Sequence, residues 1–68
     1  DIHLQTNEVL GADLRIELLD AGGHVVRAQQ GSGRQDAVIV RGELPAGMYL
    51  VRVTRTGATV FATRAVLR

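Results

Sequence analysis

The most regular alternation of apolar and polar residues along the chain lies just after position 48. Tyr49, Val51 and Val53 recur at a spacing of two with polar residues following the last two, which is typical of a half-buried strand. Met48 and Leu50 interrupt the alternation, so we expect both faces of this strand to be partly covered. The core is predicted to be built against this strand.

Turn signals flank the predicted strands. Pro45 fixes its own φ and Gly47 permits a positive φ, so residues 44–47 are predicted to turn tightly before the strand begins. An earlier strand is predicted where apolar residues 14, 16 and 18 alternate with charged residues, and it ends at Asp-Ala-Gly-Gly, residues 20–23. There Asp20 can accept a backbone N–H two residues on, which predicts a hairpin turn into a returning strand at residues 24–28.

The remaining segments show the same kinds of strand and turn signals. We expect a short strand at residues 2–4 with a polar break at 5–8, an exposed loop at 29–36, and a short apolar strand at 37–41. Thr56 and Gly57 predict a second hairpin turn into a last strand at residues 58–67. Phe61, Ala65 and Leu67 are expected on its inward face because Arg64 occupies the other one. Six short β-rich segments without a helical period predict an all-β sandwich or small barrel.

Sixty-eight residues suffice for a single domain, residues 1–68, and leave little spare stability for a deep catalytic cavity, which argues against an enzyme. The net charge is +1 but is unevenly distributed. Residues 1–36 hold three arginines against six acidic residues, a balance of −3, whereas residues 37–68 hold five arginines against one glutamate, a balance of +4. Cross-strand pairing between the two halves is one interpretation, and a basic face that meets an anionic partner is the other.

Residues with catalytic or binding potential are few and scattered. There is no cysteine, and His3 and His24 lie in different segments, so neither a metal site nor a cofactor is expected. Ser32 sits in Gly-Ser-Gly-Arg, which lacks the Gly-x-Ser-x-Gly pattern of a nucleophile elbow. Nucleic-acid and sugar platforms need exposed aromatic side chains, and the only two aromatic residues, Tyr49 and Phe61, are both expected in the core.

No apolar run approaches the length of a membrane-spanning helix. The first residues include neither an initiating methionine nor a basic leader region. We therefore expect the chain to be a fragment of a longer protein.

Three stretches together carry a family resemblance: Leu-Leu-Asp-Ala-Gly-Gly-His-Val-Val at 18–26, Leu-Pro-Ala-Gly-Met-Tyr-Leu-Val-Arg-Val at 44–53, and Arg-Ala-Val-Leu-Arg at 64–68. In order and spacing the chain resembles the C-terminal sorting domain of proteins exported by the type IX secretion system of Bacteroidetes. The resemblance implies a small immunoglobulin-like antiparallel β-sandwich of about six to seven short strands. It also implies a non-catalytic signal that docks cargo at the outer-membrane translocation machinery and is then removed by a sortase-like protease.

The resemblance also implies roles for particular residues. Asp20 and Gly23 match the family's Asp-x-x-Gly turn, Gly47 and Tyr49 match its Gly-x-Tyr segment, and Arg64 matches a basic residue that is usually lysine. The family's Pro-Asn-Pro opening has no counterpart here. By the same resemblance the cargo passes through the periplasm and the outer membrane and ends secreted or at the cell surface.

From these features we expect Pro45, Gly47, Arg64 and Arg68 to dock the partner, with no nucleic acid and no small-molecule substrate. Tyr49 is expected to be structural, its ring in the core and its hydroxyl bonded to the backbone or to water. Free edge strands also permit two copies to pair as a dimer. The alternative function is a generic extracellular immunoglobulin-like spacer or adhesion module, and a carbohydrate-binding module is disfavoured by the scarcity of aromatic residues.

Overall fold

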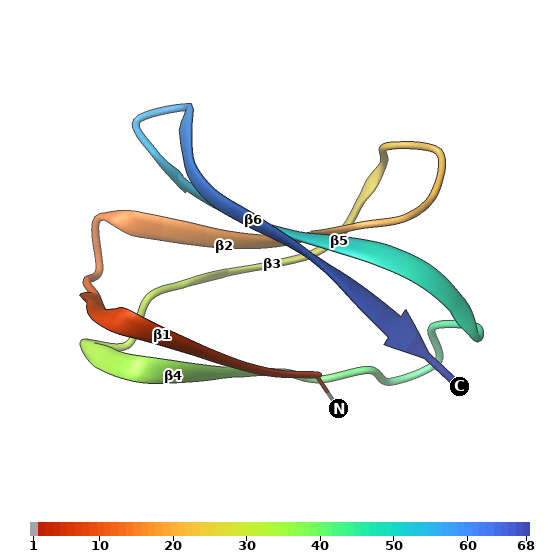
Figure 1. Cartoon of the computed structure of the whole chain (residues 1–68). Helices are drawn as coiled ribbons and strands as arrows, with labels where there is room; N and C mark the ends of the chain where they lie inside the picture. The colour runs from red at the N-terminus through yellow and green to blue at the C-terminus, as the bar shows by residue number, and fades with distance from the viewer. Residues whose placement is uncertain (1) are drawn as a thin grey trace.

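Two antiparallel sheets face each other in the computed structural model of the chain (Figure 1). The structure describes residues 2–68; residue 1 and the side chains of residues 7 and 8 lie outside the description. Within the described chain the strands are β1 (Ile2–Leu10), β2 (Leu14–Leu19), β3 (Val25–Gln30), β4 (Arg34–Ile39), β5 (Gly47–Arg55) and β6 (Ala58–Leu67).

The larger sheet has the order β3-β2-β5-β6, and the smaller one pairs β1 with β4. The hairpins β2–β3 and β5–β6 lie side by side because β2 pairs with β5, while the chain crosses to the smaller sheet for β4 and returns for β5. Every strand pair is antiparallel. The architecture is a small immunoglobulin-like β-sandwich, which confirms the predicted fold class.

The core lies between the sheets and follows the predicted alternation. On β2 and β5, Leu18 lies opposite Val51 and Ile16 lies opposite Val53, and all four side chains are almost fully buried. Ile39 of β4 closes the core from the smaller sheet. Full burial of a side chain of this size stabilises the fold by about 1.5–3 kcal/mol, so these positions hold the two sheets together.

The tight turn predicted at residues 44–47 is wrong in position. The hydrogen-bonded turn comes three residues earlier, where the Leu44 N–H donates to the Arg41 carbonyl at 3.1 Å. The segment that follows is an open bend, in which the carbonyl of Pro45 accepts a hydrogen bond from the Tyr49 side chain at 2.6 Å. A side chain therefore closes this segment where a backbone turn was expected.

Two predicted breaks are shorter than expected. The loop predicted at 29–36 shrinks to residues 31–33 because β3 extends to Gln30 and β4 occupies residues 34–39 where 37–41 was predicted. The polar break at 5–8 lies within β1, where the pairing with β4 shifts register between Gln5 and Leu10. Backbone hydrogen bonds form whatever the side chains are, so exposed polar strands give a weak signal in the sequence.

The last strand matches its predicted bounds, and its inward face is correct only at one end. Leu67 is buried and Ala65 packs against the core, but Phe61 is 41% exposed. Phe61 therefore lies on the predicted face without being covered, because the smaller sheet has only two described strands to lay over it.

Candidate docking surface

The hairpin turn between β2 and β3 is held by Asp20. Its side-chain Oδ1 accepts hydrogen bonds from the backbone N–H groups of Gly22 and His24, both at 2.9 Å, and the Gly23 N–H donates to the Asp20 carbonyl at 3.0 Å. The bonds to Oδ1 lower the pKa of the Asp20 carboxyl, the backbone N–H of His24 contributing most. Gly23 has a φ of +85°, which suits glycine. The predicted hairpin turn is confirmed.

The segment that leads into β5 is held by Tyr49. Its ring is buried, with 7% exposed, and its hydroxyl donates to the Pro45 carbonyl, as expected. Immunoglobulin-type sandwiches use a bond of this kind where a tyrosine fixes the corner before a strand. Gly47 lies between the two partners with a φ of +153°, a conformation that side chains rarely adopt.

Strand pairing brings these two segments together. Leu19, which precedes the turn, lies opposite Leu50 on β5, and Gly47 lies opposite Leu67 on β6. A shallow hollow of about 310 Å³ separates the turn from the start of β5. Both segments line it: Leu19, Asp20, Ala21, Gly23, Met48, Tyr49 and Leu50. The ends of β2, β5 and β6 thus form one continuous surface.

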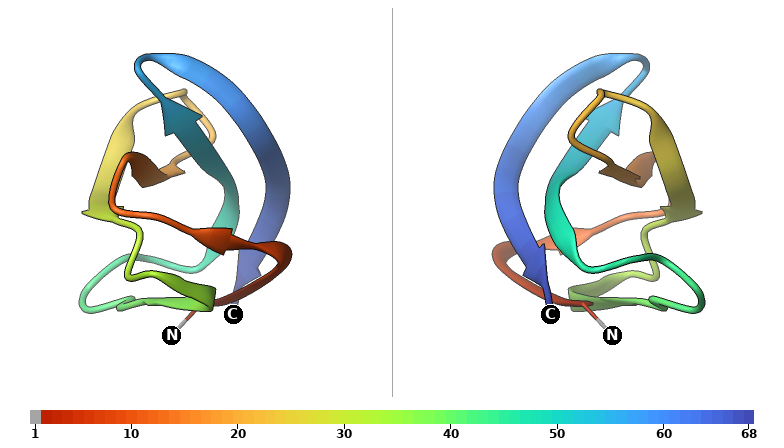
Figure 2. Two further views of the ribbon diagram at one scale, coloured as in Figure 1. Left: turned by 90° about the vertical axis from the view of Figure 1, so that its left-hand side faces the viewer. Right: turned by 90° about the vertical axis from the view of Figure 1, so that its right-hand side faces the viewer.

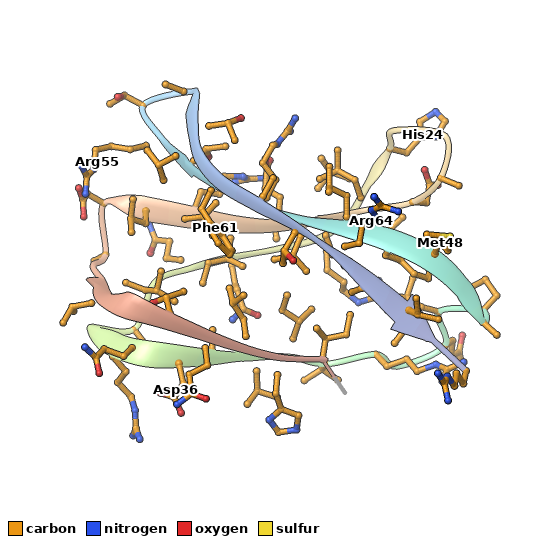
Figure 3. The ribbon with its side chains drawn as sticks, in the orientation of Figure 1. His24, Asp36, Met48, Arg55, Phe61 and Arg64 are labelled. Carbon is orange, nitrogen blue, oxygen red and sulfur yellow. The ribbon has the colours of Figure 1, made fainter. Side chains whose placement is uncertain are left out.

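At this end of the larger sheet, the face that points away from the core carries apolar as well as basic side chains. Met48 and Val66 lie opposite each other on β5 and β6 and are 53% and 58% exposed. Arg64 lies opposite Leu50 on the same face, and Figure 3 shows Arg64 and Met48 at the end of the sheet away from Phe61. We call Met48, Leu50, Arg64 and Val66 the outer patch. Sequence reasoning missed Met48 and Val66 as exposed apolar residues. The outer face that was expected to be partly covered is half-buried at Leu50 and open at Met48.

The four residues predicted to dock a partner are all exposed. Gly47 is at the first position of β5, Arg64 is on the outer patch, and Arg68 follows the end of β6 directly. The Arg68 carbonyl accepts a hydrogen bond from Nη1 of Arg41, which ties the chain end to the turn before Pro45. Gly47, Arg64 and Arg68 therefore lie at one end of the larger sheet, with Pro45 on the segment that leads into it.

Most acidic side chains near the larger sheet are already neutralised. Glu17 of β2 lies opposite Arg52 of β5 and binds it at 2.8 Å and Arg15 at 3.0 Å. Asp13 binds Arg55 at 2.9 Å. Cross-strand pairing between the acidic first half and the basic second half, one of the two interpretations of the charge pattern, is therefore present at Glu17 and Asp13.

The environment of Glu17 explains why it stays charged. Burial raises the pKa of its carboxyl, but hydrogen bonds and charges from Arg52 and Arg15 outweigh burial and hold the pKa below its ordinary value. The side chain of Arg64, in contrast, makes no hydrogen bond or ion pair with any part of the chain that the structure describes. Its positive charge is available to a partner.

Other candidate chemistry is dispersed. His3, His24 and Ser32 are exposed and lie on separate segments. Over residues 2–68, no group of three or more metal-binding side chains comes together. Over the same described range, no helix is long and apolar enough to span a bilayer.

Comparisons of the chain with protein-family models, with curated proteins and with solved structures give no match.

Proposed function

We propose that this domain is a non-catalytic sorting signal. It directs an attached cargo across the outer membrane through the type IX translocation machinery, and a sortase-like protease then removes it. The observation that supports this is the convergence of the two motif segments, residues 20–23 and 47–49, with the end of β6. Segments far apart in the sequence thereby form one surface that a partner can recognise on the folded domain.

The chemistry of that surface suits protein recognition. Met48 and Val66 offer apolar area that a partner can bury, and Arg64 and Arg68 offer positive charge beside it. Side-chain hydrogen bonds fix the backbone around this area, at the turn held by Asp20 and at the open bend held by Tyr49, so docking orders few groups. In this proposal the domain passes through the periplasm folded and presents the outer patch to the export machinery, and the cargo ends secreted or at the cell surface.

An export assay tests the proposal. Residues 1–68 are fused behind a periplasm-targeted fluorescent protein in a type IX-competent bacterium, and fluorescence is measured in the medium and on the cell surface. We expect export that disappears in a strain without the secretion machinery. A folded fusion that remains in the periplasm would contradict the proposal and favour the spacer or adhesion module.

Matched variants identify the docking surface. Arg64→Ala combined with Arg68→Ala should lower export, whereas Arg34→Ala, which removes an exposed arginine from β4, should not. Urea unfolding of all variants checks that stability is unchanged. Normal export of the double variant would exclude these two arginines as docking residues.

The reading frame of the parent gene separates the two candidate functions independently. A sorting signal requires the parent protein to end within a residue or two of Arg68. A spacer or adhesion module would instead be followed by further domains.

A further inference from the structure

A second surface lies on the open side of the sandwich, between β1 and β6. The two views of Figure 2 show both strands on the same side of the molecule, and both are edge strands of their sheets in the described chain. Between them runs a mainly apolar groove of about 380 Å³, whose lining also includes the polar residues Gln5 and Thr6 of β1. Its rim carries Val9, 57% exposed, with Val60 and Phe61, and buried Leu10, Leu14 and Val53 line it below.

Two irregularities keep the groove open. The pairing of β1 with β4 shifts register between Gln5 and Leu10, so this part of β1 is not regularly paired with β4. On β6, Phe61 lies opposite Val53 and Thr59 lies opposite Thr54, so Val60 is an extra bulged residue. The result is a contiguous apolar rim where a closed sandwich would have a further strand, and exposed apolar patches of this kind mark interaction sites.

The edge of β6 beside this groove is unpaired. β6 hydrogen-bonds to β5 on one side only within residues 2–68, so alternate backbone N–H and C=O groups face outward. Beyond the bulge, residues 61, 63, 65 and 67 face inward, and residues 62, 64, 66 and 68 face outward. An added strand would therefore present alternate side chains to the groove side and to the arginine side.

We propose that the edge of β6 binds an extended acidic segment of a partner protein as an additional strand. Apolar side chains of that segment enter the groove near Phe61, and its acidic side chains face Arg64 and Arg68. Main-chain hydrogen bonds give such a complex its affinity, and the alternate side chains give it specificity.

The charge of β6 indicates which kind of segment would pair with its free edge. β6 and the residue after it carry two arginines and no acidic residue. Antiparallel pairing of two copies through β6 would bring four arginines onto one ladder without an acidic side chain, and like charges across strands repel. An acidic segment neutralises Arg64, which has no partner in the described chain. A second copy is therefore the less favoured occupant.

This inference rests on the proposed function only for the source of the segment, the export machinery; the binding itself is a property of the isolated domain. The probe is a fluorescein-labelled peptide of alternating valine and glutamate, about eight residues long to match the span from Phe61 to Arg68. The control is a peptide of the same length in which lysine replaces each glutamate. Fluorescence anisotropy should show that the valine–glutamate peptide binds at least about tenfold more tightly than this valine–lysine peptide.

Two controls separate strand addition from simple charge attraction. N-methylation of the peptide residues whose N–H groups point toward β6 should abolish binding. N-methylation of the residues whose N–H groups point away from β6 should leave binding intact. Arg64→Glu should weaken binding of the acidic peptide about fivefold or more, whereas Arg34→Glu on β4 should have little effect.

Phe61→Ala should also weaken the binding, since it removes the largest exposed apolar group of the groove. Equal affinity for the acidic and basic peptides, or indifference to both methylation patterns, would overturn the inference. Concentration-dependent dimerisation without peptide binding would replace it with self-pairing. Peptide binding without export would leave this inference standing and contradict the proposed function alone.

Discussion

The hydroxyl of Tyr49 donates a hydrogen bond to the carbonyl oxygen of Pro45 at 2.6 Å while its ring is buried among the core residues. One side chain thus joins the core to the segment that leads into β5. This relationship fixes the backbone beside the outer patch, so the packing of the core and the shape of this surface depend on the same residue.

Tyr49→Phe should lower the free energy of unfolding by about 0.5–1.5 kcal/mol, because it removes one hydrogen bond and keeps the ring. Tyr49→Ala should cost about 3–5 kcal/mol as a large-to-small core change. Urea unfolding measures both. An export defect in Tyr49→Ala would then report folding, and equal stability of Tyr49→Phe and the wild type would show that the bond to Pro45 contributes nothing.

Gly47→Ala should destabilise the domain by about 1–3 kcal/mol, because a φ of +153° is strained for any residue with a Cβ. No heavy atom lies within 4 Å of the added Cβ, so the cost comes from the backbone alone. Thermal unfolding of this variant beside Ala46→Gly distinguishes backbone strain from general sensitivity of the segment. An unchanged unfolding temperature in Gly47→Ala would contradict the assigned strain.

Thr56→Asn should stabilise the domain by about 0.5–1 kcal/mol. Thr56 has a φ of +48°, unfavourable for a β-branched residue, and Asn-Gly is the preferred pair where both turn residues have positive φ. The measurement is the urea midpoint, with Thr59→Asn on β6 as a control that should not gain stability. A fall in stability of Thr56→Asn would show that the threonine side chain has a role in the turn.

Glu17 should make stability depend on pH. Its pKa is lowered in the folded state below the ordinary value of 4.5, so the unfolded chain takes up the proton first as the pH falls. The stabilisation is therefore complete above pH 4.5 and is lost as the pH falls through the folded pKa. Unfolding measured between about pH 7 and about pH 3 should show this loss.

Glu17→Gln should lower stability at neutral pH by about 1–3 kcal/mol and flatten the acid dependence, because it removes charged hydrogen bonds to two arginines. Asp36→Asn is the matched control, since its ion pair with Arg34 is exposed and contributes about 0–1 kcal/mol. If both variants behaved alike, burial of Glu17 between Arg15 and Arg52 would have no energetic consequence.

Local patterns were enough to predict the strands with clear alternation and both hairpin turns. Leu14, Ile16 and Leu18 face the core because side chains in a strand alternate between its two faces. Asp20 turns the chain because its side chain bonds backbone groups only two and four residues away. Such features depend on neighbours in the sequence and not on the rest of the fold.

Tertiary structure alone decided the features on which the proposed recognition rests. Phe61 has the spacing of a core residue, yet it lies at an open groove because the smaller sheet has too few described strands to cover it. Glu17 has the spacing of an exposed residue, yet the register of β2 against β5 places it beside Arg52. Register and the number of strands in each sheet are set by packing all segments together, so no single stretch of sequence specifies which edges stay free.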